Sequence, residues 1–264
     1  MKRFKGYAIP YFVWLVLFVV VPLFVMLILT FLQINAMDFS TASFSFDSYF
    51  RLADPSILKA LWNSLVVAVS TVVICLLLGY PYFLSFSKLK NKKLVLLLMI
   101  LPMWSNSMLR IVSWLRLFST DFFAAMNLLG STGAVIAVTV TTYLPFMIFP
   151  IYTILEKLDR SCLEASRDLG VNAFKTFFKV TLPLSMEGVS SGVLMVFLPA
   201  ATGFAISQTI GQGRVRLVGN LIQSVFEKNN YSFGSLLSLF VSVVILALVF
   251  VLTKIQSRKR GVAC

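Results

Sequence analysis

The 264-residue sequence contains no histidine, and its 23 basic residues stand against only 10 acidic ones. Without histidine the chain can hold neither a histidine-ligated metal nor a Ser-His or Cys-His catalytic pair. Its three cysteines, Cys75, Cys162 and Cys264, are scattered and predict no disulfide framework. Charged residues are 12% of the chain, against about 25% in an ordinary soluble domain. These absences exclude a soluble globular enzyme as the default interpretation.

Apolar residues, by contrast, make up 59% of the chain. An apolar run of about 18 or more residues predicts a membrane helix, because about 20 residues at a rise of 1.5 Å cross the hydrocarbon core. Six runs meet this criterion, at residues 10–33, 60–87, 94–118, 132–155, 188–210 and 234–255. The sequence therefore predicts an all-α membrane protein with six transmembrane helices in a single domain, residues 1–264.

The first run follows Lys2, Arg3 and Lys5, as the apolar core of a signal peptide would. It is longer than the usual 7–15 apolar residues of such a core, and no small-residue cleavage site follows it. We therefore expect a retained helix.

The distribution of basic residues predicts the orientation of these helices. Sixteen of the 23 lie in the N-terminal segment, the C-terminal segment and the loops 88–93 and 156–187, and five lie in the opposite loops. The positive-inside rule places the first set, and with it both termini, in the cytoplasm. The positive charge is thus explained by membrane topology and does not indicate nucleic acid. The two long outer loops, 34–59 and 211–233, are candidates for docking a partner.

The one long cytoplasmic loop, residues 156–187, combines five acidic residues, five basic residues and an apolar stripe. The three- and four-residue spacing of Leu163, Ser166 and Gly170, continued by aromatic residues, predicts amphipathic helix. Gly170 favours a bend between two short helices, and Pro183 is expected to end the second of them. A connector lying on the membrane surface is the simplest interpretation of such a segment.

A second interpretation comes from the exact spacing within this loop. Glu164-Ala165-Ser166, three residues, Gly170, nine residues and then Val-Thr-Leu182-Pro183 resembles the EAA signature of binding-protein-dependent ABC importer permeases. Ser166 and the valine depart from the family pattern of alanine and isoleucine. The resemblance implies a coupling helix that docks in a cleft of an ATPase subunit.

In that family Glu164 would make a polar contact with the ATPase, Ala165 and Gly170 would allow close approach, and Leu182 and Pro183 would join the helix to the fifth span. The sequence has no G-x-x-x-x-G-K-[ST] phosphate loop. The chain is therefore expected to be no enzyme by itself and to hold no cofactor, with ATP and Mg²⁺ bound by a partner ATPase.

Further segments are similar to the permease B subunits of spermidine/putrescine importers: LPMWSNS at 101–107, LPFM at 144–147, EKLD at 156–159, LPA at 198–200 and GNLI at 219–222. The resemblance implies the type I ABC importer permease fold in a bacterial inner membrane. It also implies a second, homologous permease, a dimer of ATPase subunits and an extracellular binding protein.

A polyamine pathway needs carboxylates, aromatic faces or carbonyl groups. All ten acids lie in loops or at span ends, so none lies at the bilayer centre. Related permeases are expected to carry an acid near Gln208, and a partner permease could supply the missing charge. The candidate pathway residues are Trp104, Asn106, Arg110, Asp121, Tyr143, Ser207 and Gln208.

Pro102, Asn106 and Arg110 recur at helical spacing on the third span, and Pro102 and Pro199 each remove a helix hydrogen bond. Two interpretations remain open, a translocation pathway between spans three and five and a kinked packing contact. Arg110 lies about 24 Å along its span, where a charge is costly. A gating or structural role and snorkelling to the outer surface are the alternatives for it.

The pair Gly188 and Gly192 permits close helix contact, either within the chain or with a second permease. For the whole protein, the leading prediction is a polyamine importer permease. Its rivals are a permease for another solute such as a sugar, phosphate or an iron complex, and a channel or scaffold subunit. A membrane-embedded enzyme would need convergent acids or a nucleophile–base pair inside the membrane, and none is visible in the sequence.

Overall fold

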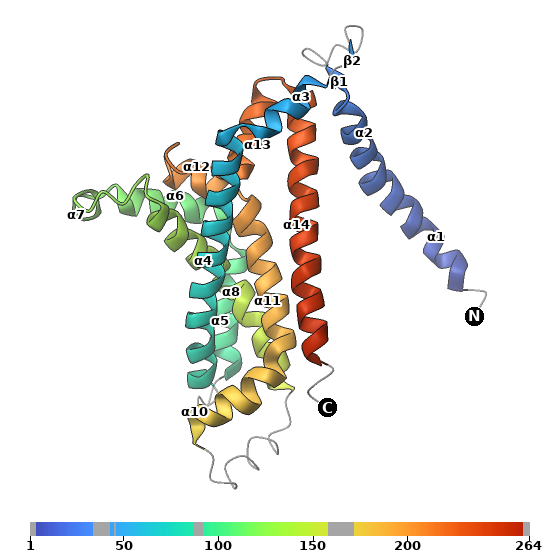
Figure 1. Ribbon diagram of the computed structural model, residues 1–264. Helices are drawn as coiled ribbons and strands as arrows, with labels where there is room; N and C mark the ends of the chain where they lie inside the picture. Colours follow the sequence, from blue (N-terminus) through green and yellow to red (C-terminus); the bar gives the residue numbers. More distant parts are fainter. Residues whose placement is uncertain (1–3, 34–42, 45, 87–91, 158–171, 261–264) are drawn as a thin grey trace. The chain divides into compact units, whose positions relative to one another are not determined.

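The computed structural model describes residues 4–33, 43–44, 46–86, 92–157 and 172–260, and these are predominantly helical (Figure 1). The chain divides into two compact units. The first comprises residues 1–59 and 221–246, and the second comprises residues 60–220 and 247–264.

Five helices in the described part of the chain are long and apolar enough to cross a membrane: Ile9–Leu29, Pro55–Tyr80, Thr132–Glu156, Phe177–Thr202 and Tyr231–Val251. They correspond to the predicted spans one, two, four, five and six. The predicted third span, residues 94–118, forms two helices, α5 (Lys92–Trp104) and α6 (Ser107–Phe118), with a break a few residues after Pro102. The fifth span also ends before its predicted limit, since α11 (Leu182–Thr202) and α12 (Ala205–Ile210) are separate helices.

The first unit begins with α1 (Phe4–Leu15), η1 (Val16–Val20) and α2 (Val21–Leu29), followed by the short strands β1 (Leu32–Gln33) and β2 (Ser43–Phe44). The strands pair antiparallel with Leu32 opposite Phe44. After them come α3 (Asp47–Phe50) and η3 (Arg51–Ala53). Ring centroids 5.8 to 6.4 Å apart link four aromatic side chains of this region: Phe31, Phe44, Phe46 and Tyr49.

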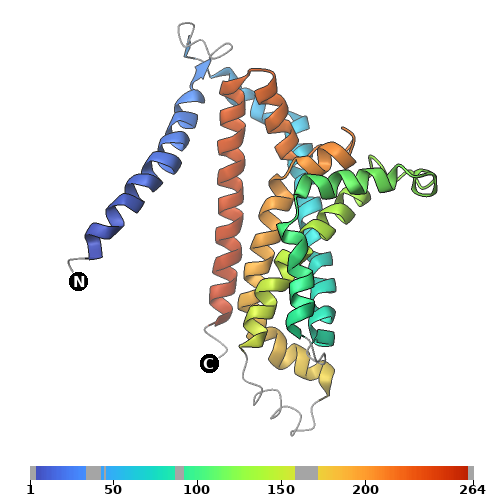
Figure 2. The ribbon, with the colours of Figure 1, turned by 180° about the vertical axis from the view of Figure 1, so that it is seen from behind.

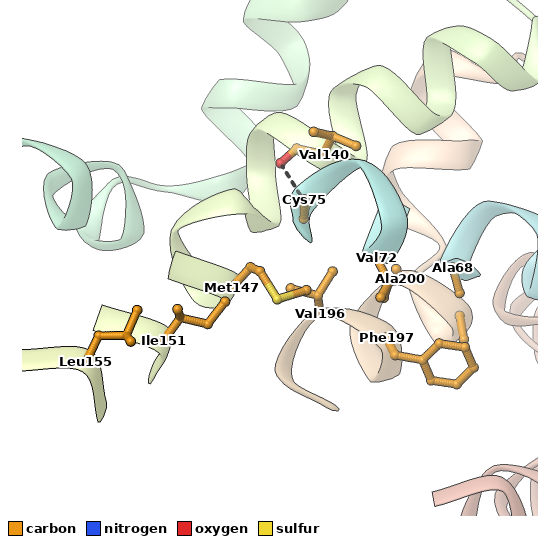
Figure 3. Packing of buried hydrophobic residues seen from close by; sticks show 11 residues of the cluster. Ala68, Val72, Cys75, Val140, Met147, Ile151, Leu155, Val196, Phe197 and Ala200 are labelled. Carbon is orange, nitrogen blue, oxygen red and sulfur yellow. Dashed lines mark hydrogen bonds between the residues drawn. The ribbon is translucent and has the colours of Figure 1, made fainter. Parts of the chain in front are cut away.

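The second unit is built on α4 (Pro55–Phe86), α8 (Thr132–Glu156) and α11, which lie side by side in both views (Figures 1 and 2). Their apolar faces form one core, in which Cys75 of α4, Met147 of α8 and Val196 of α11 are fully buried (Figure 3). A second core joins α4 and α8 to α6 and α12 through Ile111, Ile210 and their neighbours.

The remaining described helices are α7 (Asp121–Ala124), α10 (Ala173–Thr176), η4 (Phe177–Thr181), α13 (Val218–Glu227) and α14 (Tyr231–Arg260). The prediction that Pro183 ends a helix is wrong, because η4 is a π-helical turn that continues directly into α11. There the Leu182 amide donates to the carbonyl of Phe177, five residues back. A wider turn moves carbonyl groups away from the proline ring, so the helix passes Pro183 without ending. Val16–Val20 forms the same kind of turn, and Pro22 follows it after one intervening residue.

The glycine pair of the fifth span packs within the chain. A Cβ atom at Gly188 would lie 2.6 Å from the carbonyl oxygen of Pro150, and one at Gly192 would lie 3.0 Å from that of Met147. Both contacts are with α8. Of the two predicted roles for this pair, the structure shows the close contact between two helices of one chain.

Candidate functional site

Four residues of the predicted coupling motif, Glu164, Ala165, Ser166 and Gly170, lie outside the described residues. The motif's last two positions, Leu182 and Pro183, form the first turn of α11. The carbonyl oxygen of Leu182 accepts a hydrogen bond from the Ser185 hydroxyl at 3.0 Å. The described end of the motif is therefore part of a regular membrane helix.

This end of α11 is attached to α4 by a buried polar contact. The hydroxyls of Tyr80 and Ser185 are 2.7 Å apart, and Ser185 is fully buried. The Tyr80 ring also meets the Phe177 ring edge-on, with the centroids 5.2 Å apart. A displacement of the segment entering α11 would thus be passed to α4 through Tyr80.

The interruption between α5 and α6 is formed by residues 105 and 106. Asn106 has an extended backbone, and its side-chain oxygen accepts a hydrogen bond from the amide of Met108 at 2.8 Å. This is the arrangement of a helix N-cap, so α6 begins anew after the break. Ser105 donates from both its amide and its hydroxyl to the carbonyl of Pro102, which closes the end of α5. Trp104, the last residue of α5, is 86% exposed.

A second interruption separates α11 from α12. Gly203 is extended, and its amide donates to the carbonyl of Pro199 at 2.8 Å. The following turn is held by Asn220, whose side chain donates to the carbonyl of Phe204 at 3.1 Å and accepts from the Leu217 amide at 3.1 Å. Ser207 is fully buried and donates to the same Asn220 side chain.

The two interruptions meet around Arg110 and Tyr143. The second halves of the broken helices, α6 and α12, pack against each other and against α8. Arg110, in the first part of α6, interacts electrostatically with the Tyr143 hydroxyl of α8. That hydroxyl lies 3.9 Å from where a Cβ of Gly203 would stand. One residue from each of three segments therefore converges at this point.

Arg110 is only partly exposed. Its Nε and Nη1 atoms are buried, and within the described part of the chain neither has a hydrogen-bond acceptor. Snorkelling of the whole guanidinium to an outer surface does not describe this arrangement.

The other predicted pathway residues do not join this pair in the described structure. Asp121 is exposed at the first position of α7, and Gln208 is exposed on α12. The side chains of Asn106 and Ser207 are engaged by the helix cap and by Asn220. The structure thus brings Arg110 and Tyr143 together and gives Asn106 and Ser207 structural contacts.

Sequence reasoning missed the roles of Asn220, Tyr80 and Ser185. Asn220 lies directly after Gly219, where a Cβ atom would overlap the carbonyl oxygen of Thr202. A glycine followed directly by an asparagine within a predicted outer loop is a weak signal of a side chain that holds a turn of the backbone. No local pattern predicts the contact between Tyr80 and Ser185, because 105 residues separate them.

Comparison with known proteins identifies close relatives of the chain. It is 38% identical over 255 residues to the spermidine/putrescine transport system permease protein PotB of Haemophilus influenzae, covering 91% of this chain and 89% of that protein. It is 35% identical over 246 residues to the protein of the same name from Escherichia coli K12, covering 88% and 90%. The predicted resemblance to polyamine permeases is confirmed.

Solved structures show the same fold in more distant proteins. A bacterial ABC transporter involved in the import of the acidic polysaccharide alginate matches with a TM-score of 0.73 at 13% identity, covering 97% of this chain and 96% of that one. The MetNI methionine ABC transporter matches with a TM-score of 0.59 at 15% identity, covering 80% and 100%. Because the identities are only 13% and 15%, this likeness concerns the fold alone.

The fold is thus that of ABC importer permeases, and the predicted fold class is confirmed. The family described as binding-protein-dependent transport system inner membrane component matches residues 5–260, a range that runs through both compact units. The chain belongs to this family of multi-pass permeases of the bacterial inner membrane.

Proposed function

We propose that the chain is a transmembrane permease subunit of an ATP-driven importer that moves spermidine or putrescine inward by alternating access. The observation that carries this proposal is the 38% identity over 91% of the chain with a spermidine/putrescine permease. The chain itself catalyses no reaction and binds no cofactor. Its partners are a dimer of ATPase subunits holding ATP and Mg²⁺, a second permease, an extracellular binding protein and the lipid membrane, and both termini are cytoplasmic.

The pathway in this proposal passes the two interrupted helices. Non-helical backbone at membrane depth is tolerated where it lies within protein or lines a cavity. Trp104 and Tyr143 offer aromatic faces to an ammonium group, and the exposed Gln208 offers an amide oxygen. No carboxylate of the described residues joins Arg110 and Tyr143 at this point. The second permease therefore supplies the negative charge that a polycation requires.

Coupling in this proposal uses the motif that begins at Glu164. The ATPase dimer moves the segment that contains Glu164 and Gly170. The movement reaches the membrane through Leu182 and Pro183 and is shared with α4 through the Tyr80–Ser185 contact. A short rigid element that follows a moving partner is an ordinary device of hinge-type transitions.

The proposal is tested by ATP hydrolysis of the purified complex in lipid, with the cognate binding protein added empty or loaded with spermidine, putrescine, maltose or phosphate. Stimulation by the polyamine-loaded protein alone is the expected result. Stimulation by a different loaded form would keep the importer and refute the polyamine assignment. A complex that hydrolyses ATP but responds to no loaded form would contradict importer coupling itself and favour a channel or scaffold subunit.

A further inference from the structure

Glu187 lies inside a membrane helix, although the sequence places it at the end of the long loop before the fifth span. It is the sixth residue of α11. With η4, this helix forms the segment Phe177–Thr202, which is long and apolar enough to cross a membrane. The expectation that every acid lies in a loop or at a span end does not hold for Glu187.

Two contacts of α11 give the depth of Glu187 among the neighbouring helices. Ser185 is hydrogen-bonded to Tyr80 of α4, and Gly188 packs on the Pro150 carbonyl of α8. Tyr80 and Pro150 each lie six residues before the last residue of their helices. At a rise of 1.5 Å per residue, both neighbours continue about 9 Å beyond this level, on the side that the proposed topology assigns to the cytoplasm. Glu187 is therefore flanked by helices.

Glu187 belongs to a face of α11 that mixes hydrogen-bond acceptors with apolar side chains. This face is exposed except at Ser191, which is partly exposed. The hydroxyls of Ser191 and Thr202 donate to carbonyl groups of their own helix, and their oxygen atoms can still accept. Six residues spaced three or four apart make up the face: Leu184, Glu187, Ser191, Met195, Leu198 and Thr202.

The composition of this face matches the chemistry of a polyamine. A carboxylate that faced lipid tails would be costly, and acidic side chains within membrane spans almost always face the bundle interior or a water-filled cavity. A polyamine alternates ammonium groups with short methylene chains. The ammonium groups bind most strongly to a carboxylate, and the methylene chains fit apolar side chains. The face offers both kinds of contact.

We propose that Glu187 binds an ammonium group of the polyamine in the cytoplasmic half of the pathway, and that the exposed face of α11 lines this half. The inference deepens the proposed function and rests on it for the identity of the ligand. Gly203, where Tyr143 approaches, is sixteen residues further along, about 24 Å at the helical rise. The Glu187 site is thus separate from the point where Arg110 and Tyr143 meet.

The first test measures whether water reaches this face. The complex with its second permease and ATPase subunits is placed in lipid nanodiscs, and Glu187→Cys is made after alanine replaces the native Cys75, Cys162 and Cys264. Its reaction with the membrane-impermeant reagent trimethylammonium methanethiosulfonate is compared with that of Leu77→Cys. Leu77 is exposed on α4, three residues before Tyr80, and so lies at a similar depth.

We expect Glu187→Cys to react at least about tenfold faster than Leu77→Cys, because the reactive thiolate forms in water and is disfavoured in apolar surroundings. Spermidine should slow the reaction of Glu187→Cys, and maltose should not. Should Glu187→Cys fail to assemble, Ser191→Cys on the next turn of the same face takes its place, with the same expected results.

The second test measures spermidine uptake into vesicles that contain the whole complex. Glu187→Gln should lower uptake about tenfold, because its amide offers the ammonium group only a neutral acceptor. Glu187→Asp keeps the charge and should recover most of the uptake. Glu156→Gln is the control, since Glu156 is exposed at the end of α8, and it should match the wild type.

The proposal is overturned if Glu187→Cys reacts as slowly as Leu77→Cys. It is also overturned if spermidine gives no protection in a complex that transports spermidine, or if Glu187→Gln takes up spermidine at the wild-type rate. A wild-type complex that takes up no polyamine would refute the proposed function and the ligand assignment together. That failure is seen before any variant is made, so it is distinct from the others.

Discussion

Short polar side chains cap the starts of three of the described helices. Asn106 caps α6, Ser131 accepts from the amide of Ala134 at the start of α8, and Asn230 accepts from the amide of Phe233 at the start of α14. These side chains satisfy amides that have no partner within the helix. At the level of single residues, these three helix starts are thus specified by asparagine and serine.

The hydrogen bonds of the Asn220 side chain lead to a prediction about the stability of the protein. Asn220→Ala leaves the Leu217 amide and the Phe204 carbonyl without their partner, which should lower the free energy of unfolding by about 1–3 kcal/mol. Thermal unfolding of the purified protein in lipid measures this loss. Gln223→Ala, which removes an exposed contact to Glu227 on the same helix, serves as the control and should have little effect.

Ser207→Ala should add little to the Asn220→Ala loss, because both variants remove the same network. If the decreases in the free energy of unfolding caused by Ser207→Ala and Asn220→Ala simply add, the two side chains do not stabilise this turn as one network.

Asp54 predicts a pH dependence at the start of α4. Its carboxylate accepts from the Ser56 amide at 2.8 Å, and the hydrogen bonds to Ser56 lower its pKa below the ordinary value of 3.8. Stability from this group is therefore complete above pH 3.8 and is lost as the pH falls through the lower pKa of the folded state. We expect the wild type to exceed Asp54→Ala in thermal midpoint at pH 6 and to lose that advantage at acidic pH.

Asp54→Asn is the matched control, since an uncharged asparagine caps a helix equally well at every pH. Its advantage over Asp54→Ala should not change with pH. A pH dependence shared by all three proteins would assign the effect to other groups.

The helices show that proline alone does not decide where a membrane helix breaks. Pro102 and Pro199 each lie three or four residues before an interruption, whereas α8 continues through Pro145 and Pro150. The interrupted cases add a second feature, the Asn106 cap in one and the extended Gly203 in the other. A carbonyl group that proline leaves without its helix hydrogen bond permits a break in the helix. The residues that follow the proline decide whether the helix breaks.

The packing of α11 on α8 makes a prediction at the level of helices. A Cβ atom at Gly188 would lie 2.6 Å from the Pro150 carbonyl oxygen and 2.9 Å from the Ile151 Cα atom. Both are backbone atoms, so the helices must separate to admit it. Gly188→Ala should destabilise the protein by about 1–3 kcal/mol, which thermal unfolding in lipid measures.

Gly133→Ala near the start of α8 is the control, because its Cβ would meet only the Ser131 hydroxyl, at 4.0 Å. Alanine is the better helix former, so this variant should be neutral or slightly more stable. Equal behaviour of the two alanine variants would contradict close packing at Gly188.

For the whole molecule, the coupling motif distinguishes an importer from a channel. Glu164→Ala removes the proposed charged contact with the ATPase. A hydrogen bond to a charged group is worth about 1.5–3 kcal/mol, so transport should fall roughly ten- to hundredfold while the ATPase subunits still hydrolyse ATP. The measurement compares uptake into vesicles with ATP hydrolysis by the same complex.

Asp159→Ala, at an acidic position of the same loop that precedes the motif, should retain both activities. Unchanged uptake by Glu164→Ala would argue against this motif as the coupling element and would favour a channel.

The sequence by itself determined the membrane character of this protein, its family and the approximate ranges of most of its helices. Apolar run length and motif spacing are properties of the linear chain, and they need no knowledge of contacts. The tertiary structure alone decided that Gly188 and Gly192 pack on α8, that Tyr80 meets Ser185 and that Asn220 locks the turn after α11. It also decided that the Nε and Nη1 atoms of Arg110 are buried. Each of these contacts joins segments well separated along the chain, and the periodicity of one helix carries no information about its neighbour.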